Sequence, residues 1–254
     1  MDINELYASK NGVCIMWMGN DGWVINLHGV VIFTDMDLHS PEHLPLPPHV
    51  SIREMAGHIQ AVFVTHEHGD HFNAESCLYM QKHSGCVFVI PKSCYSKAIK
   101  TGLRDERIVV ASPGVDFTLL GMNVHPVRAI HGHYHGSVYS GANMGDCGYV
   151  INSKGFTLYQ PGDTLLLEEH FEMGKIDLLF FSPTEHNTHI DNSVRMIKLI
   201  RPGLAVPQHY DSYVTTAENA FWTKGYPDEV YEKLSDSEKS KYIKLPQGRP
   251  HSVV

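Results

Sequence analysis

Four side chains that bind metal ions well lie close together in the first third of the sequence. The run reads His66, Glu67, His68, Gly69, Asp70 and His71. In a tight loop, His66 and His68 point to one side, and Asp70 and His71 turn toward a second point nearby. Imidazole and carboxylate groups at a strand end are costly to bury unpaired, which disfavours a chance cluster. The run therefore predicts two adjacent metal positions.

Histidine is the residue type in excess, with 18 of 254 residues. Neutral imidazole is the commonest protein ligand for metal ions. The five cysteines are scattered and form no Cys-x-x-Cys pair, so neither a disulfide framework nor a cysteine zinc site is indicated. Imidazole with carboxylate suits Zn²⁺, which we favour, and Mn²⁺ or Fe²⁺ as alternatives because no thiolate biases the choice.

The overall composition is that of an ordinary globular protein. The formal net charge is -8 and no Lys/Arg cluster offsets it, which argues against a nucleic-acid partner. No segment approaches the roughly 18 consecutive apolar residues of a membrane span, and the N-terminus lacks the features of a signal peptide. We therefore expect a cytoplasmic protein with a small-molecule substrate and no membrane partner. A homo-oligomer is left open.

The elements around the run predict a layered α/β protein. Three apolar segments separated by Gly-containing turns predict a meander of strands, namely Val13–Met18, Trp23–Leu27 and Val30–Thr34. A helix near Ser51–Gly57, a buried strand at Ala61–Thr65, a helix at Ala74–His83 and a strand at Val87–Ile90 follow. This strand–loop–helix–strand order places the histidine run between a strand and a helix.

The proline-rich stretch Asp35–His49 predicts an irregular loop, because proline fixes φ and removes a backbone donor. The loop is either a plain surface connection or a flap over a pocket.

The second half of the chain continues with strands and ends with helices. Strands and turns are expected over Val109–Ile130, a hairpin over Gly148–Asn152 and Phe156–Gln160, and further strands at Ile176–Ser182 and Leu204–Pro207. The spacing of apolar residues predicts a helix over Asn192–Ile200 with Asp191 as its N-cap. The tail from Pro227 to Lys244 has few apolar anchors and predicts a solvated helix. We expect residues 1–254 to form a single domain.

The pattern His-x-His-x-Asp-His is the signature of the metallo-β-lactamase superfamily, and this chain resembles that family in the order of its later motifs as well. Those motifs are Ala129-Ile130-His131-Gly132-His133, Gln160-Pro161-Gly162-Asp163-Thr164 and Val206-Pro207-Gln208-His209-Tyr210. Within the superfamily, the stretches Met16–Trp23, Ala61–Thr65 and Val206–His209 resemble the ascorbate phosphate lactonase (UlaG-like) group.

The resemblance implies a four-layer αββα sandwich with two divalent metal ions. It assigns His66, His68 and His131 to the first ion, Asp70, His71 and His209 to the second, and Asp163 as a bridge. His133 is the alternative to His131 as third histidine, and the lactonase-like members are associated with manganese. A metal-bound hydroxide is then the nucleophile, and either Asp70 or the bridging hydroxide itself manages the proton.

The resemblance also suggests residues that contact substrate or support the ligands. Family members have an aspartate at the end of this strand, here Asp35, which hydrogen-bonds the loop that carries the metal ligands. His133 and His135 lie beside His131. Glu185, His186 and His189 occupy a segment that faces the pocket in the family. Tyr210 follows the last ligand and can donate a hydrogen bond to substrate. We take His189 and Tyr210 as catalytic candidates, and Glu185, His133 and His135 as substrate or supporting contacts.

Three functions fit these residues. Hydrolysis of a small-molecule ester or lactone follows the subgroup resemblance. A phosphodiesterase acting on a small phosphodiester or RNA is the alternative, although the acidic net charge argues against RNA. A redox or non-catalytic metal protein is a third reading, weakened because diiron relatives carry Glu where this chain has His68.

Overall fold

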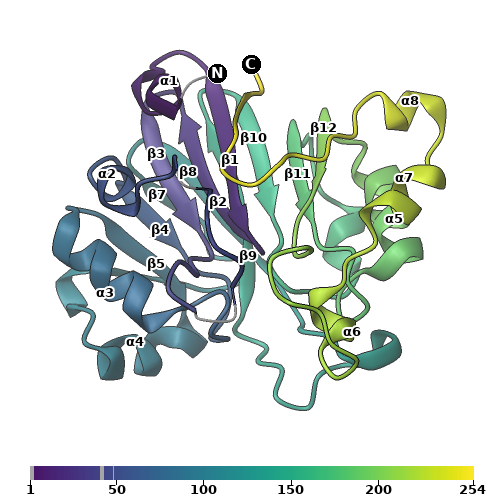
Figure 1. The fold of residues 1–254 in the computed structure, drawn as a ribbon, viewed down its shortest axis with the longest axis horizontal. Helices are drawn as coiled ribbons and strands as arrows, with labels where there is room; N and C mark the ends of the chain where they lie inside the picture. The colour runs from purple at the N-terminus through teal and green to yellow at the C-terminus, as the bar shows by residue number, and fades with distance from the viewer. Residues whose placement is uncertain (1–2, 41–42, 48) are drawn as a thin grey trace. The chain divides into compact units, whose positions relative to one another are not determined.

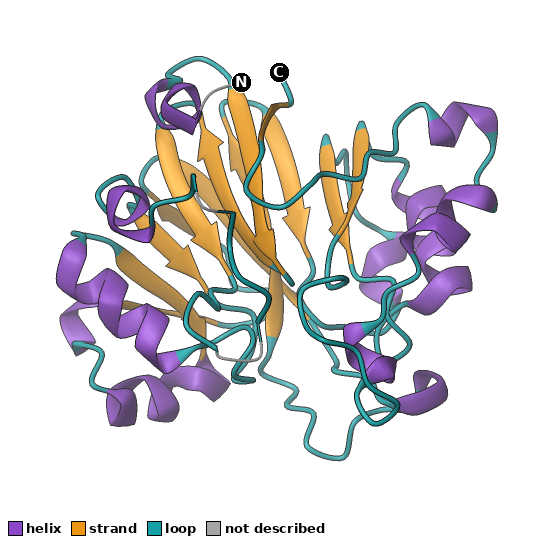
Figure 2. Ribbon diagram, in the orientation of Figure 1, coloured by secondary structure: helices purple, strands orange, loops and turns teal. Residues whose placement is uncertain are grey.

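The chain divides into two compact units in the computed structural model, which describes residues 3–40, 43–47 and 49–254. Unit 1 comprises the described residues of Met1–Ala111 together with Leu245–Val254, and unit 2 is Ser112–Lys244. Each unit contains one mixed β-sheet and its own helices (Figure 2), so the predicted α/β class is confirmed. That the whole chain acts as a single domain stays a prediction.

The sheet of unit 1 has the strand order β13-β1-β2-β3-β4-β5-β6. Its strands are β1 (Val13–Gly19), β2 (Gly22–Leu27), β3 (Val30–Thr34), β4 (Ala61–Phe63), β5 (Val87–Pro91), β6 (Ile108–Ala111) and β13 (Pro250–Ser252). Pairing is antiparallel from β13 to β3 and parallel from β3 to β6. The parallel strands β3 and β4 therefore end at the same edge of the sheet.

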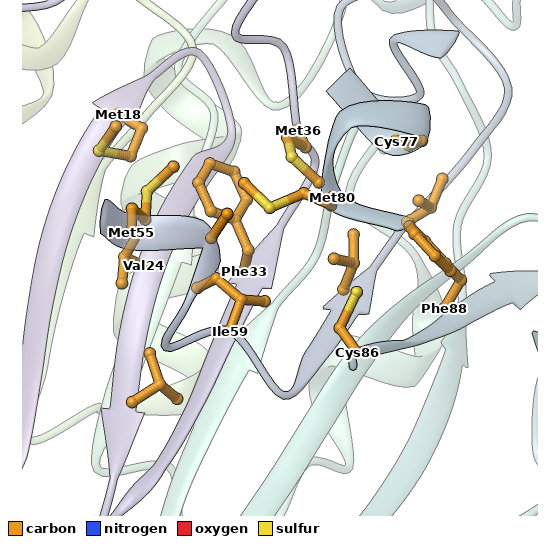
Figure 3. Close-up of a cluster of buried hydrophobic side chains, with 14 of the residues drawn as sticks. Met18, Val24, Phe33, Met36, Met55, Ile59, Cys77, Met80, Cys86 and Phe88 are labelled. Carbon is orange, nitrogen blue, oxygen red and sulfur yellow. The ribbon is translucent and has the colours of Figure 1, made fainter. Parts of the chain in front are cut away.

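The helices of unit 1 cover one face of its sheet (Figure 1). They are α1 (Ile3–Ala8), α2 (Ile52–Ala56), α3 (Ala74–His83) and α4 (Tyr95–Thr101), with 3₁₀ turns at Lys92–Cys94 and Asp105–Arg107. Apolar side chains of the strands and helices form one buried cluster, in which Phe33 lies among Met36, Met55, Ile59 and Met80 (Figure 3). This cluster holds the end of β4 in place, and the loop that carries the histidine run His66–His71 follows that strand.

The sheet of unit 2 has the order β12-β11-β10-β9-β8-β7. Its strands are β7 (Phe117–Leu119), β8 (Met122–Arg128), β9 (Cys147–Ser153), β10 (Phe156–Gln160), β11 (Leu178–Phe181) and β12 (Leu204–Pro207). Pairing is antiparallel from β7 to β10 and parallel from β10 to β12. The hairpin turn between β9 and β10 contains Lys154 and Gly155, both with positive φ, as the tightest hairpins require.

The helices of unit 2 are α5 (His189–Ile200), α6 (Ala220–Thr223), α7 (Pro227–Glu232) and α8 (Asp236–Lys239), with 3₁₀ turns at Tyr134–Gly136 and Glu168–Phe171. Helix α5 buries Val194, Met196, Ile197 and Ile200 against Leu179 and other apolar residues of the sheet. The long loop over residues 129–146 contains the first 3₁₀ turn and connects β8 to β9.

Most predicted elements occur close to their expected bounds, but two details were wrong. Helix α5 begins at His189 rather than at Asn192, so Asp191 lies in its first turn instead of capping it. The tail is not one solvated helix: it forms α7 and α8, and Val230 and Leu234 are buried in the core of unit 2. The break occurs at Ser235, which starts α8 with a reciprocal capping pair to Glu238.

The predicted proline-rich loop over Asp35–His49 contains no helix in its described residues. Pro41, Glu42 and Pro48 lie outside the described residues, and a flap role for this loop stays a prediction. Within the described part of the chain, none of the helices is long and apolar enough to cross a membrane.

Substituting Phe33→Ala will test the core of unit 1. Phe33 is fully buried, so we expect its loss to lower the free energy of unfolding by about 3–5 kcal/mol. Val110→Ala on β6 removes an exposed side chain of the same unit and is expected to change it by no more than about 0.5 kcal/mol. Denaturant unfolding measures both, and equal effects would contradict this description of the core.

Candidate metal centre

The histidine run of unit 1 lies in the loop between β4 and α3. Helix α3 starts after Asn73, whose side chain caps it by accepting from Ser76 N at 2.9 Å. His66 and His71 are buried, whereas His68 and Asp70 are partly exposed. The end of one parallel strand and the start of one helix therefore hold the run at both ends.

His66 and His68 present a pair of ring nitrogens to each other. His66 Nε2 lies 3.0 Å from His68 Nδ1. On the other side of the ring, His66 Nδ1 lies 3.1 Å from Thr65 Oγ1, and that hydroxyl donates its own proton to Asp35 Oδ2 at 2.8 Å. Because the hydroxyl proton is used in this way, Thr65 Oγ1 accepts from His66 Nδ1–H. The lone pair of His66 is then on Nε2, which faces His68.

Asp35 supports the run from the end of β3. Its Oδ1 accepts from Thr65 N at 2.8 Å, and its Oδ2 lies 3.0 Å from His71 Nδ1. The contact orients His71 so that Nε2 faces the other way, toward Asp70 Oδ2 at 3.4 Å. Burial raises the pKa of Asp35, and the hydrogen bonds with His71 and Thr65 oppose that shift. Metal-binding histidines commonly have such a carboxylate on their second nitrogen.

Asn20 is a contact that the sequence reasoning missed. It occupies the β1–β2 turn with φ of 47°, and its amide donates to Asp70 Oδ2 at 3.0 Å. The backbone carbonyl of Asn20 accepts from Trp17 Nε1 at 2.8 Å. The signal available in the sequence was the turn Gly19-Asn20-Asp21-Gly22, which supported a strand connection and the lactonase resemblance but was given no role at the site.

In unit 2, imidazole groups converge on Asp163, which follows β10. Asp163 Oδ2 lies 2.9 Å from His186 Nε2, 3.2 Å from His131 Nε2 and 3.3 Å from His209 Nε2. Its other oxygen, Oδ1, accepts from Asn187 Nδ2 at 2.7 Å. The structure therefore brings three predicted ligands of this unit together and adds His186, a residue named in the sequence reasoning only as part of a pocket segment.

His131 rather than His133 faces Asp163. His131 Nδ1 lies 2.7 Å from its acceptor, the carbonyl of Gly132, which leaves Nε2 toward the carboxylate. The ring of His133 instead stacks on Tyr139 with an interplanar angle of 15° and contacts Phe221. The structure therefore places His131 rather than His133 at Asp163, and the role of either histidine as a metal ligand stays a prediction.

The other predicted site residues of unit 2 lie in different surroundings. His135 is exposed and lies 3.3 Å from Glu185 Oε1. His189 is exposed at the start of α5, with its ring edge against Tyr226. Tyr210 is buried, which raises the pKa of its hydroxyl, and Lys244 Nζ lies over its ring. Their catalytic or substrate roles stay predictions.

The spacing of the donor atoms fits metal coordination. Two ligands of a tetrahedral ion lie about 3.3 Å apart when each is about 2.0–2.1 Å from the metal. The donor pairs in unit 1 lie at 3.0 and 3.4 Å, and the three histidine contacts of Asp163 lie at 2.9–3.3 Å. Burial lowers the pKa of His186, and the neighbouring Asp163 carboxylate opposes that shift. Each donor set therefore suits a divalent ion.

Comparison with known proteins finds a family model and relatives that match most of this chain. Residues 30–210 match the family model of the beta-lactamase superfamily domain. A UPF0173 metal-dependent hydrolase of Thermococcus onnurineus is 29% identical over 204 residues, covering 74% of this chain and 79% of the relative.

Two solved structures share the fold at low sequence identity. Igni18, a metallo hydrolase from the archaeon Ignicoccus hospitalis, has a TM-score of 0.74 at 20% identity, covering 94% of this chain and 97% of its own. An isothiocyanate hydrolase from Delia radicum gut bacteria has a TM-score of 0.71 at 16% identity, covering 94% of this chain and 99% of its own.

Asp35→Asn will test the support of the ligand loop. The amide keeps the shape of the side chain but weakens the acceptor that orients His71, so we expect metal affinity to fall by about 10–100-fold. Asp177→Asn is the control, since Asp177 supports the backbone of β10 at Thr157 N and lies in unit 2. Calorimetric titration with Zn²⁺ measures both variants, and wild-type affinity in Asp35→Asn would show that the carboxylate is dispensable.

Proposed function

Because the chain belongs to the metallo-β-lactamase superfamily, we propose that it is a metal-dependent hydrolase that binds two divalent metal ions. Membership confirms the fold class predicted from the sequence, and metal-dependent hydrolases are among its relatives. The observation that carries the proposal is the group of histidine nitrogens within 3.3 Å of Asp163 Oδ2. A divalent cation among these buried donors would offset the cost of desolvating the Asp163 carboxylate.

The proposed ligands are the ones that the family pattern assigns. His66, His68 and His131 would hold the first ion, Asp70, His71 and His209 would hold the second, and Asp163 would contribute to both. Zn²⁺ is our first choice of metal, and Mn²⁺ or Fe²⁺ are the alternatives.

The chain's own residues orient the ligands and move the proton. When bound, two divalent ions supply Lewis acidity and lower the pKa of a water molecule to about 7. Asp70 is proposed to accept the proton of that water, since its side chain is 20% exposed. Asn20 holds Asp70 through Oδ2, and Asp35 holds His71 through Nδ1. Neither a serine nor a cysteine nucleophile is required.

The proposed substrate is a small-molecule ester or lactone. The sequence resemblance to the lactonase group supports this class. The net charge of -8 and the absence of a basic cluster in the sequence disfavour a polyanion such as RNA. Hydrolysis of a small phosphodiester uses the same donor set and is an outcome that the activity test distinguishes. A cytoplasmic location is proposed on the composition alone.

Metal content is the first test. We expect the purified chain, after reconstitution, to hold two divalent ions per molecule by elemental analysis. Removing them with a chelator should lower the melting temperature, because the ions bind the folded state and leave buried donors uncompensated when lost. Traces of metal alone after reconstitution, with an unchanged melting temperature, would contradict the proposal.

Turnover is the second test, measured on a panel of lactones, phosphodiesters and thioesters with Zn²⁺ and Mn²⁺ supplied separately. His66→Ala and Asp163→Ala should each lose more than about 100-fold in kcat/KM, beyond the range typical of residues that only orient a ligand. His125→Ala is the control because His125 is exposed and pairs with Asp116. Near wild-type rates in either ligand variant would refute the assignment.

A further inference from the structure

His186 is a buried histidine that the family's ligand set does not include. It lies in the loop between β11 and α5, and its side chain is 2% exposed. Its Nε2 is 2.9 Å from Asp163 Oδ2, closer than the nitrogens of His131 and His209. One donor atom from each of His131, Asp163 and His186 lies within 4.8 Å of the others. Any ion held by Asp163 and His131 therefore has a third donor beside it.

The backbone of α6 sets the orientation of the His186 ring. The carbonyl oxygen of Phe221 lies 3.3 Å from His186 Nδ1 and also accepts from His186 N at 3.2 Å. A carbonyl can only accept, so a ring proton on Nδ1 would find its acceptor here and would leave the lone pair on Nε2, as a metal ligand requires. His131 has the same arrangement, with its Nδ1 on the carbonyl of Gly132. Metal-binding histidines commonly donate their second N–H to a backbone carbonyl in this way.

Several histidine nitrogens crowd one oxygen of Asp163. A carboxylate oxygen offers about two lone-pair positions, and three Nε2 atoms face Oδ2. With protons on Nδ1, the nitrogens of His131 and His186 turn lone pairs toward a negatively charged oxygen. Asn187 Nδ2 also lies 3.2 Å from His186 Nε2, but its two protons have closer acceptors in Asp163 Oδ1 at 2.7 Å and Thr184 Oγ1 at 3.0 Å.

Gly132 allows the two histidine segments to lie against each other. A Cβ at this position would come within 2.0 Å of the carbonyl oxygen of His186. The chain after His131 therefore passes directly over the backbone of His186. This close approach brings both rings to the same carboxylate oxygen.

We infer that His186 is a metal ligand, sharing with Asp163 and His131 one of the ions of the centre. The inference rests on the proposed function, since it requires that the centre binds metal. It adds an imidazole to the set assigned by the family pattern and raises the number of protein donors available to that ion. The alternative role is that of a positioning residue, in which His186 Nε2–H merely holds Asp163 by a hydrogen bond.

His186→Gln separates these two roles. The glutamine amide can still donate a hydrogen bond to Asp163 but does not replace the imidazole nitrogen. For a ligand, we expect the affinity for one of two Co²⁺ ions to fall at least about 10-fold, the range seen even for outer partners of ligands. The visible absorption of bound Co²⁺ should change, and pulsed EPR of the Mn²⁺-loaded chain should detect one imidazole fewer. His170→Gln is the matched control, because His170 is equally buried in unit 2 but bonds Tyr159 Oη at 2.9 Å.

Wild-type Co²⁺ affinity and absorption in His186→Gln would overturn the inference and favour the positioning role. Should that variant fail to fold, His186→Gly with added imidazole replaces it: recovery of the Co²⁺ absorption supports the inference, and no recovery counts against it. Failure of the proposed function appears separately, as a wild-type chain that binds no metal.

Discussion

Asp163 is buried with imidazole nitrogens against one of its oxygens and an amide against the other. Desolvating a carboxylate is costly unless the carboxylate is paired or holds a metal ion. In the proposed centre, a divalent cation would offset that cost, because it is attracted by the carboxylate and accepts nitrogen lone pairs. If the proposed centre binds metal, its loss would leave these buried donors uncompensated, so metal binding would be coupled to the stability of the fold.

Parallel strands explain why distant residues meet at Asp163. Strands β10, β11 and β12 are neighbours, and their carboxyl ends lie at one edge of the sheet. Asp163 follows the first, His186 the second and His209 the third, so three loops deliver their side chains to one place. Unit 1 is arranged in the same way, because Asp35 follows β3 and Thr65 follows the parallel neighbouring strand β4. Ligand sites at the carboxyl ends of parallel strands are general in open α/β sheets.

Phe221 connects the ligand loops of unit 2 to its C-terminal helices. Its carbonyl backs His186, while its ring contacts His133 and lies 4.1 Å from the ring of Tyr134. The segment that follows His131 is thus held by aromatic packing rather than by the ligands alone. His131 and His133 looked equivalent in the sequence, but their contacts differ. His131 faces Asp163, and His133 stacks on Tyr139.

The sequence alone determined the donor chemistry, because His66–His71 is a local run whose residue types and spacing need no distant partner to be recognised. It also determined most strands and helices, since their apolar periodicity is local. It did not determine where β13 pairs, because Ser252 meets Cys14 across almost the whole chain. Nor did it determine that His131 faces Asp163, that Asn20 holds Asp70, or that His186 joins them. Those outcomes depend on which strand ends become neighbours and which carbonyl orients each ring, and only the tertiary structure decides both.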